Sequence, residues 1–198
     1  FLLSVIDPGD EVLIPSPYWV SYPDMVRIAG GKPVILETTA QSEFKIKPDQ
    51  LQEAMTSKTK VLILNYPSNP TGTVYSKDEL IALAKILEQT NVWVVSDEIY
   101  EKLIYEAEFI SFASLSEDAF NRTLTVNGFS KSFAMTGWRL GFAAGPKSVI
   151  AAMSTLQGQS TSNANSIAQK AGLKALELGQ ELLRPMVDTF KKRRDRMA

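Results

Sequence analysis

Strand-length apolar runs that alternate with helix-period segments constrain this chain more than any other feature of its sequence. The runs are EVLIP, KPVILE, KVLILN, VWVVS, TLTVN and LGFAAG, between residues 11 and 145. Strands that alternate with helices in this way are typical of parallel sheets with helical connections. The sequence therefore predicts an α/β domain with a mainly parallel sheet.

The helix signals lie between these runs and after them. In SKDELIALAKILEQT, residues 76–90, Ser76 and Glu79 form a capping-box pattern. Four apolar residues of this segment recur at helical spacing, which predicts one buried face: Leu80, Leu83, Ala84 and Leu87. After Pro146 the pattern is helical to the end, through residues 147–157, 165–177 and 181–197, and Gly179 and Pro185 predict breaks or kinks.

The amino acids that are absent exclude several kinds of chemistry. The 198-residue chain has no cysteine and no histidine, which rules out disulfides, thiolate nucleophiles, histidine bases and Cys/His zinc sites within it. Its chemistry must therefore use Lys, Asp, Glu, Tyr, Ser or a cofactor. The 21 basic and 22 acidic residues give a net charge of -1, so we expect neither nucleic acid nor an anionic membrane as a partner.

The two ends of the chain bear on targeting signals, missing segments and charge clusters. The opening FLLSVI lacks a basic region and is too short for a signal peptide, so a cytoplasmic location is the default. Because the first residue is not methionine and lies in a helix-like segment, we expect a fragment whose N-terminal part is missing. The cluster KKRRDR at residues 191–196 is interpreted as a solvated helix face, with an interaction patch as the alternative.

Chemically versatile side chains follow four of the predicted strands. Ligands of open α/β sheets bind outside the carboxyl ends of the strands. The segments at these positions are SPYW at 16–19, NYPSNPTG at 65–72, DEIY at 97–100 and GFSKS at 128–132. We therefore expect these four segments to assemble one site.

Asp97 and Tyr100, in VVSDEIY, have two interpretations that this segment leaves open. A strand-end carboxylate and a tyrosine three residues later can face one ligand across a turn, and they can equally be a helix cap and a packed tyrosine. The segment also resembles the magnesium-binding Walker B motif, which requires a phosphate loop G-x-x-x-x-G-K-[ST]. The one Gly-Lys pair, Gly31-Lys32, is followed by Pro33 and lacks the upstream glycine. A nucleotide hydrolase is therefore disfavoured.

Asn69 and Trp19 are further candidate ligand-binding residues, and each also has a purely structural interpretation. Pro67 and Pro70 stiffen NYPSNPTG, and Pro70 favours an extended Asn69, which suits an amide that orients a ligand. The alternative is a connecting turn before a capped helix. Trp19 offers a flat face that can stack on an aromatic ring, although a tryptophan buried in the core is the commoner case.

The segment TVNGFSKSFAMTGWRLGF, residues 125–142, places cations among apolar residues and glycines. A lysine is ordinarily solvated, but a desolvated lysine loses its proton more easily and becomes the nucleophilic amine that Schiff-base chemistry needs. Lys131 is such a candidate, and Ser130 beside it offers a hydroxyl. Arg139 offers a planar fork of donors that suits a phosphate. Together the candidate residues offer an amine, a guanidinium, a carboxylate, a phenol, an amide and an aromatic face. One small molecule can bind to all of these groups.

These motifs resemble those of the class I aminotransferases of fold type I, which use pyridoxal 5'-phosphate. SPYWVSYP, NPTG, SDEIY and SKSFAMTGWRLG stand in the family's order and approximate spacing, and the resemblance covers essentially all 198 residues. It implies a three-layer α/β/α large domain over residues 1–178 and a helix over 179–198 that leads toward a smaller domain. The sequence is most similar to the bacterial and plastid-type aspartate aminotransferase branch, some of whose members accept prephenate.

The resemblance also implies a role for each matching residue. Lys131 would form the internal aldimine and then move the proton between the substrate and the cofactor, and Asp97 would pair with the pyridine nitrogen. The other matches would bind the cofactor: Tyr100 and Asn69 at its phenolic oxygen, Arg139 and Ser130 at its phosphate, and Trp19 stacked on its ring. The implied reaction transfers an amino group between an amino acid, aspartate or glutamate, and a 2-oxo acid, in a homodimer and without a metal.

Other functions fit the same motifs. Carbon-sulfur lyases and aminocyclopropane carboxylate synthases share this site, because the cofactor supplies the difficult chemistry. A non-catalytic sensor domain of a transcription regulator is a further alternative, which would carry a DNA-binding segment upstream. The family's phosphate-binding turn is expected upstream of Phe1, and its arginine for the substrate carboxylate downstream of Ala198. A tyrosine from the second subunit is expected at the phosphate.

Overall fold

All six predicted runs are strands of one sheet. The structure is a computed structural model that describes residues 1–197, and the strand order is β2-β1-β3-β4-β5-β6. The strands are β1 (Glu11–Pro15), β2 (Lys32–Leu36), β3 (Thr59–Asn65), β4 (Trp93–Asp97), β5 (Thr123–Gly128) and β6 (Gly141–Ala144). The first five run parallel and β6 pairs antiparallel with β5. The expected mainly parallel sheet is confirmed.

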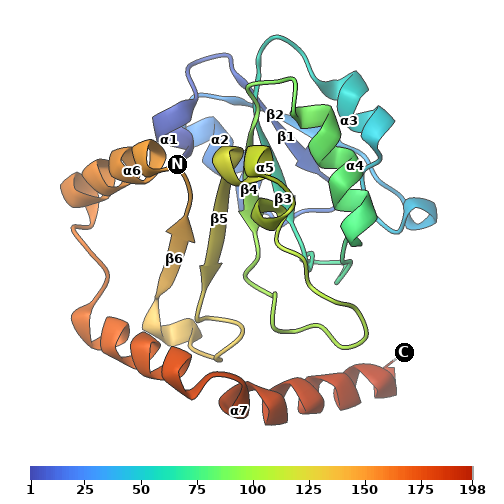
Figure 1. The fold of residues 1–198 in the computed structure, drawn as a ribbon. Coiled ribbons are helices and arrows are strands. Elements are labelled where there is room, and N and C mark those ends of the chain that lie inside the picture. Colours follow the sequence, from blue (N-terminus) through green and yellow to red (C-terminus); the bar gives the residue numbers. More distant parts are fainter. Residues whose placement is uncertain (198) are drawn as a thin grey trace.

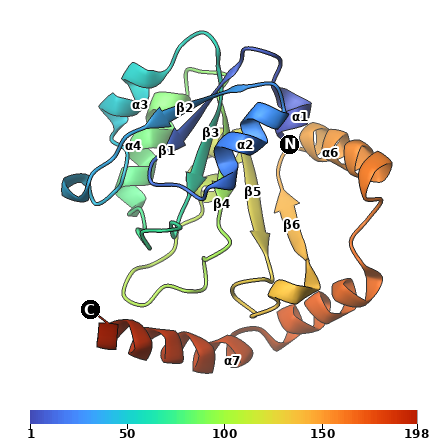
Figure 2. The same cartoon turned by 180° about the vertical axis from the view of Figure 1, so that it is seen from behind.

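Helices cover both faces of the sheet, as the three-layer expectation requires (Figures 1 and 2). One face packs against α1 (Leu2–Val5) and α2 (Ser21–Ile28). The other face packs against α3 (Pro48–Ala54), α4 (Lys77–Leu87) and α5 (Glu117–Arg122). Consecutive residues of a strand point to opposite faces of the sheet. In β3, Leu62 packs on the face covered by α3, α4 and α5, and Ile63 packs on the face covered by α1 and α2. Short 3-10 turns lie at Ala40–Ser42, Phe112–Ser114 and Thr136–Trp138.

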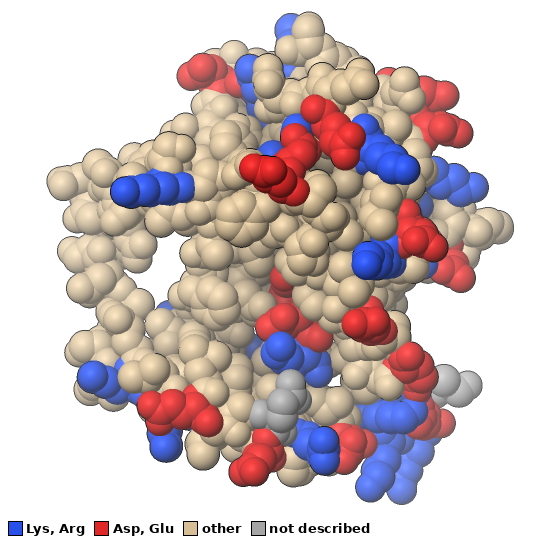
Figure 3. Space-filling model, in the orientation of Figure 1, with Lys and Arg blue, Asp and Glu red and all other residues tan. Residues whose placement is uncertain are grey.

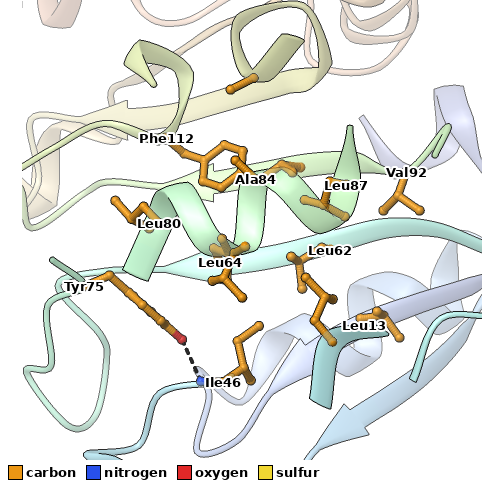
Figure 4. Close-up of a cluster of buried hydrophobic side chains, with 14 of the residues drawn as sticks. Leu13, Ile46, Leu62, Leu64, Tyr75, Leu80, Ala84, Leu87, Val92 and Phe112 are labelled. Carbon is orange, nitrogen blue, oxygen red and sulfur yellow. Dashed lines mark hydrogen bonds between the residues drawn. The ribbon is translucent and has the colours of Figure 1, made fainter. Parts of the chain in front are cut away.

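The predicted face and cap of α4 are both present. The Ser76 hydroxyl accepts the backbone N–H of Glu79, and the Glu79 carboxylate accepts the N–H of Ser76 at 2.6 Å. Four α4 side chains are buried against β3, β4 and Phe112 (Figure 4): Leu80, Leu83, Ala84 and Leu87. Burial of a leucine stabilises the fold by about 1.5–3 kcal/mol. This core fixes where β3 and β4 end.

The last quarter of the chain is helical and is divided at Gly179 as expected. After α6 (Lys147–Ser160), the two predicted segments 165–177 and 181–197 lie in α7 (Ser166–Met197), which consists of two helices joined across a kink. The break predicted at Gly179 is confirmed, because its φ of 54° and ψ of -136° are not helical. No break occurs at Pro185, which lies inside the helix. In Figures 1 and 2, α7 passes the end of the sheet toward which β5 points.

Small residues of α7 hold the loop that follows β5. Phe129 and Leu140 are buried with Ala168 and Ala175 in a third apolar cluster. Between those alanines, Gly172 leaves no room for a side chain, since an added Cβ would lie 2.5 Å from Leu140 Cδ2 and 3.0 Å from Phe129 Cζ. The loop from Phe129 to Leu140 therefore packs directly on the helix backbone.

The far end of α7 is joined to the segment after β4 by exposed ion pairs. Arg194 and Lys191 both donate to the Glu106 carboxylate at 2.6 Å, and the Arg194 guanidinium lies 4.8 Å from the Tyr105 ring centroid. Figure 3 shows basic side chains gathered at this end with acidic ones beside them. Because the groups are exposed, we expect little stabilisation from each pair. No helix within residues 1–197 combines the length and apolarity that a membrane span requires.

The packing at Gly172 gives a paired prediction. Gly158 on α6 has no atom within 4 Å of a built Cβ, so Gly158→Ala should raise the free energy of unfolding by about 0.5–1 kcal/mol through helix propensity. Gly172→Ala should instead lower it by about 1 kcal/mol, because the methyl group overpacks the cluster. Denaturant unfolding of both variants measures the difference. Equal stabilisation at the two positions would contradict the close packing.

Candidate functional site

The structure brings all seven sequence-predicted site residues around one cavity of about 330 Å³. The cavity lies beyond the carboxyl ends of β3, β4 and β5. Its predicted lining residues are Trp19, Asn69, Asp97, Tyr100, Ser130, Lys131 and Arg139. Five further lining residues were not assigned from the sequence: Tyr22, Asn65, Ile99, Val126 and Thr136. The four predicted segments thus meet, while the chemical role of each side chain stays a prediction.

Asp97 is the last residue of β4 and is partly buried. Its Oδ2 accepts the Tyr22 hydroxyl at 2.6 Å, and its Oδ1 accepts the backbone N–H of Ile99 at 3.2 Å. A turn and no helix follows, so the helix-cap alternative is wrong. Within residues 1–197 Asp97 makes no ion pair. Burial raises the pKa of the Asp97 carboxyl, and the two hydrogen bonds offset only part of that rise.

Asn65 connects two of the site segments. It ends β3 directly opposite Asp97 in the parallel register. Its Nδ2 donates to the Asp97 carbonyl at 3.0 Å, and its Oδ1 accepts the N–H of Asn69 at 2.8 Å. The proline-stiffened loop is therefore also fixed to the neighbouring strand end. Asn65 could have been identified from the sequence as the polar residue at the end of an apolar strand.

Lys131 lies in the loop that Phe129 anchors against α7. Its side chain is half-buried, and Nζ lies 5.4 Å from the centroid of the Tyr100 ring. Among residues 1–197 the Lys131 amine has no ion-pair or hydrogen-bond partner within the protein. An amine that contacts an aromatic face and has no acceptor is available to a ligand in the cavity.

Arg139 approaches the same cavity from the other end of this loop. Its backbone is left-handed, with φ 51°, and its Nη1 donates to the Thr136 carbonyl at 2.8 Å. The guanidinium is exposed and has no carboxylate partner in the part of the chain described. The loop's ends are held together because Gly128 and Gly141 are register partners in the β5–β6 ladder. Two cations, Lys131 and Arg139, are thus presented by one closed loop.

Trp19 lies just before α2, and Tyr22 is the second residue of that helix. Trp19 is 41% exposed at the cavity, so the alternative of a core tryptophan is wrong. The Tyr22 ring packs edge-on against Trp19, with centroids 5.5 Å apart and planes at 88°. Burial and the neighbouring Asp97 charge raise the pKa of Tyr22, which keeps its hydroxyl protonated as a donor. The quoted motif SPYWVSYP already contained Tyr22, but no feature of the sequence linked it to Asp97.

A second and larger cavity adjoins this site. Its volume is about 920 Å³, and its wall includes Asn69, Tyr100 and Lys131. Phe190 and Arg194 of α7 also line it. The smaller cavity can therefore hold a flat ring against Trp19 while a second molecule reaches Lys131 through the larger one.

The donor set of the smaller cavity defines what it can hold. Within residues 1–197, Asp97 has no cation partner and Arg139 has no carboxylate partner, and Trp19 offers a flat face to the cavity. A planar aromatic ring that carries a protonated nitrogen at one edge and an anionic group at another complements all three. No group of three or more acidic metal-ligating side chains occurs among the residues that the structure describes.

Comparisons with known proteins agree with this geometry. Residues 1–198 match the family described as Aminotransferase class I and II. The chain is 50% identical over 196 residues to an aspartate/prephenate aminotransferase of Cereibacter sphaeroides, covering 98% of this chain and 49% of that protein. It is 54% identical over 199 residues to a bifunctional aspartate aminotransferase and glutamate/aspartate-prephenate aminotransferase of Petunia hybrida, covering 98% and 41%.

A solved structure is similar over the same range. The aspartate aminotransferase of Rhizobium meliloti superposes with a TM-score of 0.95 at 44% identity, covering 98% of this chain and 49% of that chain. The chain thus spans about half the length of the curated relatives that it matches.

The raised pKa of Asp97 predicts a stability gain on its neutralisation. A neutral side chain here stabilises the fold below the ordinary aspartate pKa, and that stabilisation is lost as the pH rises through the higher folded-state pKa. In the ligand-free protein, Asp97→Asn should therefore raise the melting temperature near pH 7 by about a few degrees. The gain should vanish near about pH 3, where the wild-type carboxyl is protonated as well.

Calorimetry at the two pH values tests this expectation. Asp188→Asn, at an exposed position of α7, controls for the loss of one negative charge. A wild-type protein that is the more stable at both pH values would show that the Asp97 charge is well solvated.

Proposed function

Because the chain belongs to the class I and II aminotransferase family, we propose that the complete protein is a pyridoxal 5'-phosphate-dependent aminotransferase. It transfers the amino group of aspartate or glutamate to a 2-oxo acid. One observation carries the proposal: Lys131, Asp97 and Trp19, which come from three separate segments, line the same cavity. The names of the relatives, which include aspartate and prephenate, support these substrates.

The residues present fit this cofactor. Its flat ring matches the exposed Trp19 face, and its basic ring nitrogen matches the Asp97 carboxylate, which has no cation of its own in the described chain. Its phosphate matches the Arg139 guanidinium and the Ser130 hydroxyl, and its phenolic oxygen matches Tyr100 and Asn69. A cavity of about 330 Å³ lies within the ordinary range for small-molecule sites, about 300–1,000 Å³.

The cofactor, when bound, supplies an aldehyde and an electron-poor ring that withdraws electrons from the substrate α-carbon. The protein's part is to hold charges and move one proton. The Asp97 carboxylate favours a proton on the ring nitrogen, which strengthens that withdrawal. Arg139 and Ser130 keep the phosphate in place, and Trp19 sets the plane of the ring. The Lys131 Nζ then takes the α-proton of the substrate as a general base.

The lining of the two cavities supports separate places for the cofactor and the substrate. The smaller one contains Asp97, Trp19 and Arg139, and the larger one does not. Lys131 and Tyr100 border both. The substrate therefore approaches from the larger cavity, and Lys131 stands between it and the cofactor.

The wider organisation is part of the proposal. Residues 1–178 form the cofactor-binding large domain, and the chain after the Gly179 break leads toward a smaller domain. The complete protein is a homodimer in the cytoplasm. Several exposed apolar side chains of α6 and α7 support a covered surface there: Leu156, Ile167, Leu173 and Leu176.

Replacement of Lys131 tests the function. In the complete protein, Lys131→Ala should lower aspartate:2-oxoglutarate transamination by at least about a thousandfold, because loss of a general base alone costs about 10²–10⁴-fold. It should also lose tight cofactor retention on gel filtration. Lys170→Ala, at an exposed position of α7, is the matched control and should behave as wild type.

The outcomes separate the alternatives. Wild-type transamination by Lys131→Ala would refute the assignment of that residue. A wild-type protein that binds the cofactor but transfers no amino group to any 2-oxo acid would instead favour the sensor-domain alternative, and release of ammonia would favour a lyase.

A further inference from the structure

Tyr22 joins two functional groups that lie on different elements. It is the second residue of α2, its side chain is 6% exposed, and its hydroxyl donates to Asp97 Oδ2 at 2.6 Å. Its ring also makes a T-shaped contact with Trp19, which lies just before this helix. No ladder or helix requires a hydroxyl at this position, so the contact with Asp97 is the feature to explain.

The bond to Tyr22 completes a fixed pair of donors around the Asp97 carboxylate. The Ile99 N–H occupies Oδ1 and the Tyr22 hydroxyl occupies Oδ2. Each carboxylate oxygen has about two acceptor sites, so each oxygen of Asp97, which lines the cavity, can accept one more hydrogen bond. Hydrogen bonds to a carboxylate favour its charged form, which burial opposes. Without Tyr22, the carboxylate would lose both an orienting contact and a stabiliser of its charge.

We propose that Tyr22 is a positioning residue that holds the Asp97 carboxylate ionised and directed at the ring nitrogen of the cofactor. The inference rests on the proposed function, since it concerns the same pyridoxal site. Tyr22 itself acts through Asp97, while Lys131 and the other lining residues contact the ligands. The other groups that face Asp97 in the cavity and can carry charge are Tyr100, Lys131 and Arg139.

Binding of two ligands distinguishes a positioning role of Tyr22 from a purely structural one. Pyridoxal 5'-phosphate has the ring nitrogen, and its carbocyclic analogue, with carbon in place of that nitrogen, does not. In the complete apo protein, Tyr22→Phe keeps the ring against Trp19 and removes only the hydroxyl. It should weaken binding of pyridoxal 5'-phosphate about tenfold and leave the affinity for the analogue within about twofold of wild type.

Tyr75→Phe is the matched control. Tyr75 is also buried, and its hydroxyl accepts the N–H of Ile46 at 3.0 Å, away from the cavity (Figure 4). This variant should bind both ligands as wild type does. A second measurement follows the Asp97 carboxyl by carbon-13 NMR in the apo proteins, where Tyr22→Phe should shift its titration to higher pH and Tyr75→Phe should not.

The possible failures are distinguishable. Equal weakening for both ligands, or no weakening for either, would overturn the role of Tyr22, and so would an unchanged Asp97 titration. Failure of the wild-type protein to bind pyridoxal 5'-phosphate would refute the proposed function itself. If Tyr22→Phe does not fold, Tyr22→His, which retains an N–H donor and a ring, should recover the preference for the nitrogen-containing ligand, and its failure to do so would also count against the proposal.

Discussion

Burial of the sheet on both faces decides where chemistry can take place in this molecule. Val12 and Leu13 are fully buried on opposite sides of β1, and the same holds along β3. In β3 the polar side chains Thr59, Lys60 and Asn65 lie at the two ends of the strand, and its interior is apolar. Neighbouring strands lie about 4.8 Å apart, so Asn65 and Asp97, which are register partners, come together without a special arrangement of loops. The cavity is a consequence of the sheet.

The site residues also include a partly buried charge and left-handed backbone conformations, both of which lower the stability of the fold. Asp97 is partly buried without a cation in the described chain, which costs solvation energy that its two hydrogen bonds only partly offset. Arg139 and Ala134 have left-handed backbones at φ 51° and 52°, a conformation that costs a non-glycine residue roughly 1–2 kcal/mol. Both costs lie in the two segments that would contact the cofactor. A ligand that supplies a cation to Asp97 and an anion to Arg139 would relieve the electrostatic part.

Much of this arrangement follows from sequence pattern, and the rest depends on tertiary contacts. The strands, the cap of α4 and the break at Gly179 have local causes, namely apolar runs, a Ser-x-x-Glu pair and a residue without Cβ. The seven site residues could be grouped because four motifs each follow a strand. The hydrogen bond from Tyr22 to Asp97 spans 75 positions, and no local rule connects such residues. Likewise, the packing of Phe129 and Leu140 directly on Gly172 of α7 joins segments that are distant in the sequence, and no local pattern predicts it.

The β5–β6 hairpin closes the segment from Phe129 to Leu140 into a loop, because its flanking glycines sit on one rung of the ladder. The entropy of bringing Lys131 and Arg139 near each other is therefore lost during folding and not during ligand binding. For a molecule already held by one of these cations, the other is present at a high effective concentration, as in a tethered bivalent receptor. Affinity for a two-ended ligand then exceeds what either cation provides alone. If Arg139 binds the phosphate of the proposed cofactor and Lys131 its carbonyl group, the hairpin would make the two contacts cooperative.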